Sequence, residues 1–213
     1  MLNHYYTIKE AGIHEISIQK SRFIGHIERV KSVQEAQQFI QRIKKKHYNA
    51  THNCSAYLIG DFNDIQKAND DGEPSGTAGM PMLDALQKLE LKNTVAVVTR
   101  YFGGIKLGAG GLIRAYSSAT SETIKHTGIV QRTLMQGFLI SIPYPLLGKI
   151  QHHLETSPHI IDNIDYLEHV NLSVYTKAGE EDTFSNEIIN LSNDQATIKE
   201  IGKKYIETNV DLD

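Results

Sequence analysis

The stretch that most constrains the fold is NTVAVVTRYF, residues 93–102, which is followed directly by GGIKLGAGGLIRAYSSAT, residues 103–120. The first ten residues are mostly apolar and β-branched, which predicts a central strand buried on both faces. A glycine-rich loop follows, and the helical spacing of the next apolar residues predicts a long helix from about Gly111 to Thr127. A strand, a glycine turn and a helix in this order can bind anions, because free backbone N–H groups meet at the start of the helix.

Alternating and helical patterns continue upstream of this stretch. Residues 13–18 and 22–30 alternate apolar and polar side chains and predict two strands, and CSAYLIG, residues 54–60, predicts a third. Ser32 and Glu35 form a capping box at the start of a helix that ends in a basic run. A second helix carries Pro81 in its first turn, where a missing N–H is tolerated.

The pattern downstream of residue 132 is strand, helix, strand, strand, helix, strand. This βαββαβ order is the ferredoxin-like arrangement. We therefore predict an α+β protein of two domains, residues 1–130 and residues 131–213.

Charge is distributed unevenly between these two parts. The 213-residue chain has a net charge of −3, but residues 1–130 carry 16 Lys and Arg against 12 Asp and Glu, whereas residues 131–213 carry 6 against 13. The two parts are therefore expected to have different partners, with a possible protein partner for the acidic second part. We expect no membrane span or signal peptide, and together with a single cysteine, Cys54, this indicates a cytoplasmic protein.

Three cations lie in or beside the glycine loop: Arg100 before it, Lys106 within it and Arg114 in the following helix. GGIKLGAGG matches neither the dinucleotide-binding nor the P-loop pattern, so a nucleotide-specific cradle is not expected. Three interpretations stay open: glycines required by tight packing, an anion or backbone-binding site, and catalysis.

A second unusual stretch, DDGEPSGTAGMP, contains Asp70, Asp71 and Glu73. These carboxylates could bind a divalent cation or act as an acid/base pair, but the stretch also reads as a turn or as a partner for Arg100 or Arg114. We favour the turn or the pairing. Ser75 and Thr77 are better explained by capping than as nucleophiles.

KKKHYNATHNC offers His47, His52 and Cys54 as zinc ligands, but no second ligand pair follows at the usual spacing. We expect no metal and no cofactor. The run Lys44, Lys45 and Lys46 fits a solvated helix end and also suits phosphate contacts.

DDGEPSGTAGMP followed by VAVVTRYFGGIKLGAGGLIRAYSSA closely resembles the signature of the IMPACT family, in particular its bacterial YigZ-like members. KSRFIGH (residues 20–26) and ATHNCSAY (residues 50–57) also resemble the first half of that family. The resemblance implies a first domain similar to the second domain of a small-subunit ribosomal protein and to domain IV of elongation factor G, and a second domain similar to the factor's next domain. It implies no accepted catalytic residues.

These features favour a translation-linked regulatory protein that binds RNA or the ribosome. The alternatives are a metal-assisted enzyme acting on a phosphorylated small molecule, which we favour less, and a protein–protein adaptor. The expected nucleic-acid-binding residues are Arg22, Lys44, Lys45, Lys46, Arg100, Lys106, Gly108, Gly110, Gly111 and Arg114. The family-motif loop comprises Asp70, Asp71, Gly72, Glu73, Pro74, Ser75, Gly76, Thr77 and Gly79.

Overall fold

The computed structural model describes residues 1–211, which form two compact units. The first unit contains residues 1–132 and 208–211, and the second contains Thr133–Glu207. The predicted α+β class is confirmed, since both units pair antiparallel strands with helices.

The first unit is built on a five-stranded antiparallel sheet in the order β2-β3-β6-β4-β5. The strands are β2 (Gly12–Ile18), β3 (Ser21–Arg29), β4 (His52–Ile59), β5 (Ile65–Asn69) and β6 (Thr94–Tyr101). The predicted central strand is confirmed, because β6 lies third in the order and seven of its eight residues are buried. The sequence patterns did not reveal β5 or the short strand β1 (His4–Ile8).

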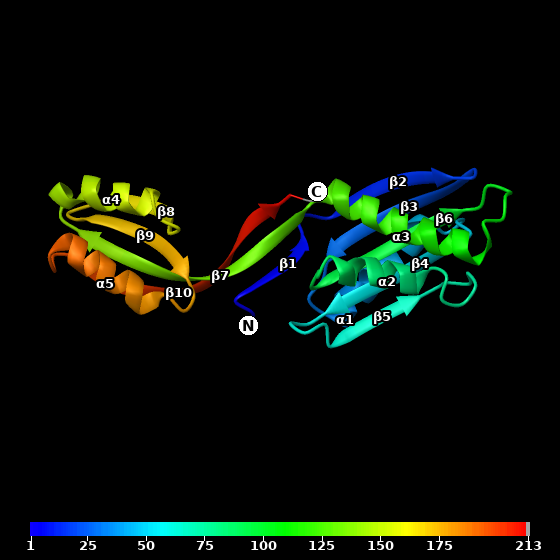
Figure 1. Ribbon diagram of the computed structural model, residues 1–213, viewed down its shortest axis with the longest axis horizontal. Coiled ribbons are helices and arrows are strands. Elements are labelled where there is room, and N and C mark those ends of the chain that lie inside the picture. The colour runs from blue at the N-terminus through cyan, green and yellow to red at the C-terminus, as the bar shows by residue number, and fades with distance from the viewer. Residues whose placement is uncertain (212–213) are drawn as a thin grey trace. The chain divides into compact units, whose positions relative to one another are not determined.

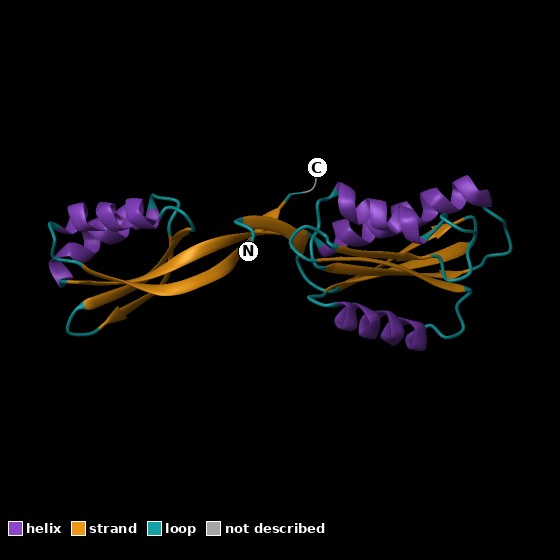
Figure 2. Ribbon diagram, turned by 90° about the horizontal axis from the view of Figure 1, so that it is seen from below, coloured by secondary structure: helices purple, strands orange, loops and turns teal. Residues whose placement is uncertain are grey.

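Helices cover both faces of this sheet (Figures 1 and 2). α1 (Val33–Lys46) packs on one face, where Phe39 and Ile43 meet Val95 and Val97. α2 (Gly79–Lys88) and α3 (Gly108–Thr127) pack on the other face, where Met82 and Tyr116 contact the core. Side chains alternate along a strand, so β6 supplies both cores.

The predicted cap of α1 is confirmed in part. The Ser32 side chain accepts a hydrogen bond from the N–H of Glu35 at 3.2 Å, but the Glu35 carboxylate accepts from the backbone N–H of Lys31 instead of that of Ser32. The predicted start of α3 is three residues late, because the helix begins at Gly108 and includes Gly110 and Gly111. Helical glycines are unfavourable on propensity alone, which explains the error.

The second unit has the predicted ferredoxin-like topology. Its strands lie in the order β10-β7-β9-β8, and Figure 2 shows α4 and α5 on the same face of the sheet. Its core includes Phe138, Ile150, Leu172 and Phe184. The elements are β7 (Ile129–Ile142), a 3₁₀ turn (Tyr144–Leu146), α4 (Leu147–Glu155), β8 (Ile160–Tyr166), β9 (Val170–Lys177), α5 (Glu181–Ser192) and β10 (Thr197–Val210).

Candidate functional site

The order of the elements brings every candidate site residue to one end of the first unit. β3 begins at this end, α1 returns to it, and β4 starts there. β5 and β6 also finish at this end, so the acidic loop and the glycine loop both lie there, before α2 and α3. We call it the loop end of the unit. In Figure 1 it is the end at which the loop between β6 and α3 lies.

Asp70 is a structural carboxylate. Its two oxygens accept backbone N–H groups from Gly76 at 2.8 Å, Ala78 at 3.0 Å and Gly79 at 2.8 Å. Burial alone would raise the pKa of Asp70, but these three hydrogen bonds outweigh burial and hold the pKa below its ordinary value. The anion therefore satisfies orphan donors at the start of α2, whose N-cap Ala78 has no capping side chain.

Asp71 joins α1 to β4. One carboxylate oxygen accepts from Lys44 Nζ at 2.5 Å, and the other accepts from the backbone N–H of Asn53 at 2.7 Å. His52 Nδ1 donates to the Asp71 carbonyl at 2.8 Å, since a carbonyl oxygen can only accept. Lys44 is thus engaged within the protein.

Glu73 makes the predicted pairing, and its partner is Arg100. Arg100 Nη1 lies 2.6 Å from Glu73 Oε1, and the Tyr116 hydroxyl donates to the same oxygen at 2.8 Å. The two charged side chains are 6% and 3% exposed. The acidic loop is therefore fixed against β6 and α3 by a buried ion pair.

These contacts bear on the metal-assisted alternative. Each of the three carboxylates already accepts hydrogen bonds from protein donors, so a cation would have to displace them. Residues 1–211 contain no cluster of three His, Cys, Asp or Glu side chains arranged to hold a metal ion. Cys54 is buried and its Sγ donates to the Asp70 carbonyl; burial raises its pKa to about 12, so it stays a thiol at neutral pH.

The remaining loop residues support the turn. The Thr77 hydroxyl donates to the Pro74 carbonyl at 2.6 Å within the turn, whereas the N-cap of α2 is Ala78, which has no side-chain cap. Gly79 lies so close to the end of β5 that a Cβ there would be 2.5 Å from the backbone nitrogen of Asn69. The Gly72 and Gly76 backbones have positive φ, which glycine adopts without strain.

The idea of one basic face containing all the predicted cations requires a correction. Arg100 is 5% exposed, because β6 directs it to the same side as Ala96 and Val98, beneath the loops. Arg22 lies on the other side of the sheet, where it forms a bidentate ion pair with Glu15 and stacks over Tyr101. Both are therefore engaged, and neither is a free surface cation.

The other predicted cations are exposed at the loop end. Lys45, Lys46, Lys106 and Arg114 have exposed side chains, and within residues 1–211 none pairs with a carboxylate. Lys20 belongs with them and was missed by the sequence reasoning. Its place is set by Gly103, where a Cβ would lie 2.0 Å from the Lys20 carbonyl carbon. We call Lys20, Lys45, Lys46, Lys106 and Arg114 the basic set.

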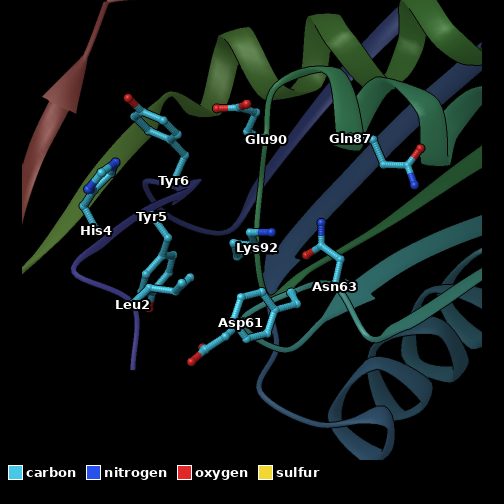
Figure 3. Close-up of a pocket in the computed structure, with 10 residues that line it drawn as sticks. Leu2, His4, Tyr5, Tyr6, Asp61, Asn63, Gln87, Glu90 and Lys92 are labelled. Carbon is cyan, nitrogen blue, oxygen red and sulfur yellow. The ribbon is translucent and has the colours of Figure 1, made fainter.

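Two pockets of the first unit have volumes near 400 Å³. One, of about 390 Å³, lies at the loop end and is lined by residues that include His52, Pro74, Arg100, Phe102, Lys106 and Ala109. The other, of about 360 Å³, lies at the opposite end between β1 and the turns around Asn63 and Glu90 (Figure 3). The second pocket mixes acidic, basic and aromatic side chains without a buried cation, and none of the predicted site residues lines it.

No helix within residues 1–211 combines the length and the apolar character needed to cross a bilayer.

Comparison with known proteins finds two family models that match separate parts of the chain. Residues 19–124 match the family model described as the Impact N-terminal domain, and residues 140–195 match a domain of unknown function, DUF1949. A solved structure described as "Crystal structure of an hypothetical protein" is 30% identical, with a TM-score of 0.60, and covers 93% of this chain and 97% of that one.

Two of the named relatives below match along most of the chain, and a third matches less than half of it. The IMPACT family member YvyE of Bacillus subtilis (strain 168) is 56% identical over 207 residues, which is 97% of this chain and 95% of that protein. The IMPACT family member YigZ of Escherichia coli (strain K12) is 34% identical over 82% of this chain and 87% of its own length. A Protein IMPACT homolog of Dictyostelium discoideum is 40% identical over 44% of this chain and 28% of its own length. The chain therefore belongs to the IMPACT family.

Proposed function

We propose that this protein binds RNA, in the ribosome or free of it, through the loop end of its first unit, and that it acts on translation in the cytoplasm. One observation carries the proposal. At the loop end the carboxylates of Asp70, Asp71 and Glu73 are held by protein donors, whereas the five cations of the basic set face solvent without carboxylate partners.

This separation of charge matters more than the net charge of −3. Exposed cations gain their affinity for nucleic acid by releasing counterions from phosphates, whereas a cation paired with a carboxylate has little to gain. Phosphate contacts position a protein without reading sequence, so we expect affinity with weak sequence specificity.

The basic set also predicts the salt dependence. If four of the five cations contact phosphates of a single-stranded RNA, log K should fall against log salt with a slope of about −3, from roughly −0.7 per phosphate contact. Fluorescence anisotropy of a labelled RNA over a range of salt concentrations measures this slope.

The test uses two paired variants of the full chain. Lys106→Ala with Arg114→Ala removes two members of the basic set and should reduce affinity several-fold and flatten the slope by about 1.4. The matched control is Lys88→Ala with Lys125→Ala, which removes two exposed lysines near the ends of α2 and α3, at the opposite end of the same unit. A flat slope for the wild type, or equal losses in the two pairs, would refute the proposal. Co-sedimentation with ribosomal subunits would then show whether the RNA is ribosomal.

A further inference from the structure

The pocket at the loop end has features that the basic set does not explain. Its volume of about 390 Å³ lies within the range of about 300–1,000 Å³ typical of small-ligand sites. One part of its wall is polar and the other is apolar. We call it the α3 pocket.

The polar wall is the first turn of α3. Gly108 and Ala109 line the pocket, the N-cap Leu107 has no capping side chain, and the first turn contains no acidic residue. Backbone N–H groups at such a start lack intrahelical partners and favour an anion, and Lys106 adds a charge beside them.

Arg100 supplies a second, independent sign of a ligand. It lines the α3 pocket and is 5% exposed, yet only its Nη1 meets Glu73, and its buried Nε has no hydrogen-bond partner within the described residues. Buried donors are almost always satisfied, so the guanidinium in the wall of the α3 pocket carries a donor that the described residues leave without an acceptor.

The apolar wall suits a flat ring. It includes Pro74, Phe102, Leu107 and Leu112. The Phe102 ring lies 5.5 Å from the Arg100 guanidinium, and the residue is 47% exposed although it is apolar. An aromatic ring that is supported by a cation and open to solvent is the kind of surface on which bases of single-stranded nucleic acids stack.

We propose that the α3 pocket binds one unpaired nucleotide, with its phosphate at the first turn of α3 and its base against Phe102. The inference rests on the proposed RNA-binding function and deepens it. The basic set holds the phosphate backbone, while the α3 pocket selects a nucleotide that is terminal or extruded from a helix, since a paired base cannot enter.

The test is a ¹H–¹⁵N NMR titration of the full chain with uridine monophosphate, with uridine and with inorganic phosphate. The monophosphate should shift the amides of Gly108, Ala109 and Gly110 at millimolar concentration, with weaker shifts for phosphate and for uridine, because each supplies half of the contacts. No shift at these amides, or equal shifts with uridine alone, would overturn the proposal.

A substitution of the ring separates stacking from charge. Phe102→Leu should weaken binding of the monophosphate about tenfold, in line with the measured range for base–aromatic stacking. Phe62→Leu is the matched control, because Phe62 is 79% exposed and lies outside the α3 pocket. The same spectra show whether each variant is folded.

The two proposals fail in different ways. RNA binding that falls with salt but is unchanged by Phe102→Leu, together with unshifted α3 amides, overturns the pocket and leaves the proposed function intact. Binding of the monophosphate without any binding of RNA overturns the proposed function and identifies the ligand as a free nucleotide. Binding of RNA and of the monophosphate, both weakened by Phe102→Leu, supports both proposals.

Discussion

The Glu73–Arg100 ion pair gives the sharpest prediction for the first unit. Glu73→Gln keeps the shape of the side chain and an acceptor for the Tyr116 hydroxyl, but it removes the charge that faces Arg100. The two side chains are only 3% and 6% exposed, so solvent cannot replace the missing carboxylate. Breaking a buried pair in this way costs about 3–5 kcal/mol, which is more than a hundredfold in the unfolding equilibrium.

The assay must report on the first unit alone, because the chain has two units and contains no tryptophan. Native-state hydrogen exchange provides this, since amides of β4 and β6 report the first unit and amides of β9 report the second. Glu73→Gln should lower protection in β4 and β6 and leave β9 unchanged.

Two further variants compare the buried pair with an exposed pair and with an apolar replacement. Glu15→Gln breaks the exposed Arg22 pair, whose side chains are 54% and 40% exposed, and should lower protection in β4 and β6 far less than Glu73→Gln does. Replacing Glu73 and Arg100 together by methionine should cost less than Glu73→Gln alone, because no unpaired charge then stays buried. A loss for Glu73→Gln as small as that for Glu15→Gln would show that the pair is not buried.

Gly79, Asp70 and His26 of the first unit can each be probed by substitution or titration. Gly79→Ala should destabilise the first unit by more than about 1 kcal/mol, read as lost hydrogen-exchange protection in β4 and β6, because the new Cβ would lie 2.5 Å from the Asn69 backbone nitrogen. Gly110→Ala, in the same unit, should not, because its Cβ would meet only the Arg114 side chain at 3.7 Å. The pKa of Asp70 is lowered in the folded chain, so its contribution to the free energy of unfolding is full above the ordinary carboxyl range and is lost as pH falls through the folded pKa. Asp70→Asn should remove this part of the pH dependence of the free energy of unfolding. Burial, with His47 and Lys46 nearby, lowers the pKa of His26 to about 4. The His26 ring should therefore titrate in NMR near pH 4, and the free energy of unfolding should fall as the pH is lowered from 6.5 towards 4. A midpoint of the ring titration above pH 6 would contradict this.

The elements that the sequence predicted well are those with strong local patterns. β6 is a β-branched run, and α1 has both a capping serine and a regular apolar stripe. β5 was missed because four of its five residues are exposed and it lies at the edge of the sheet, so it has little apolar pattern to detect.

The sequence alone left two partners open for the acidic loop, Arg100 and Arg114. Strand alternation decides between them, since Arg100 shares a face with Ala96 and Val98, and that face is covered by α2 and α3. Arg114 lies on the exposed side of α3 instead. Had alternation been carried from the core to the end of the strand, the buried pair could have been predicted.

Glycine composition explains how a chain of negative net charge can present a positive end. Asp70 reaches three backbone N–H groups only because the loop reverses tightly at Gly72 and Gly76 and then packs Gly79 against Asn69. The glycine loop likewise packs Gly103 against Lys20, and the N-cap of α3 is Leu107, which has no side-chain cap. The glycines therefore act on the electrostatics of the surface through geometry: they direct the carboxylates towards protein donors, and the lysines and α3 amides that remain are the groups left to meet an anion.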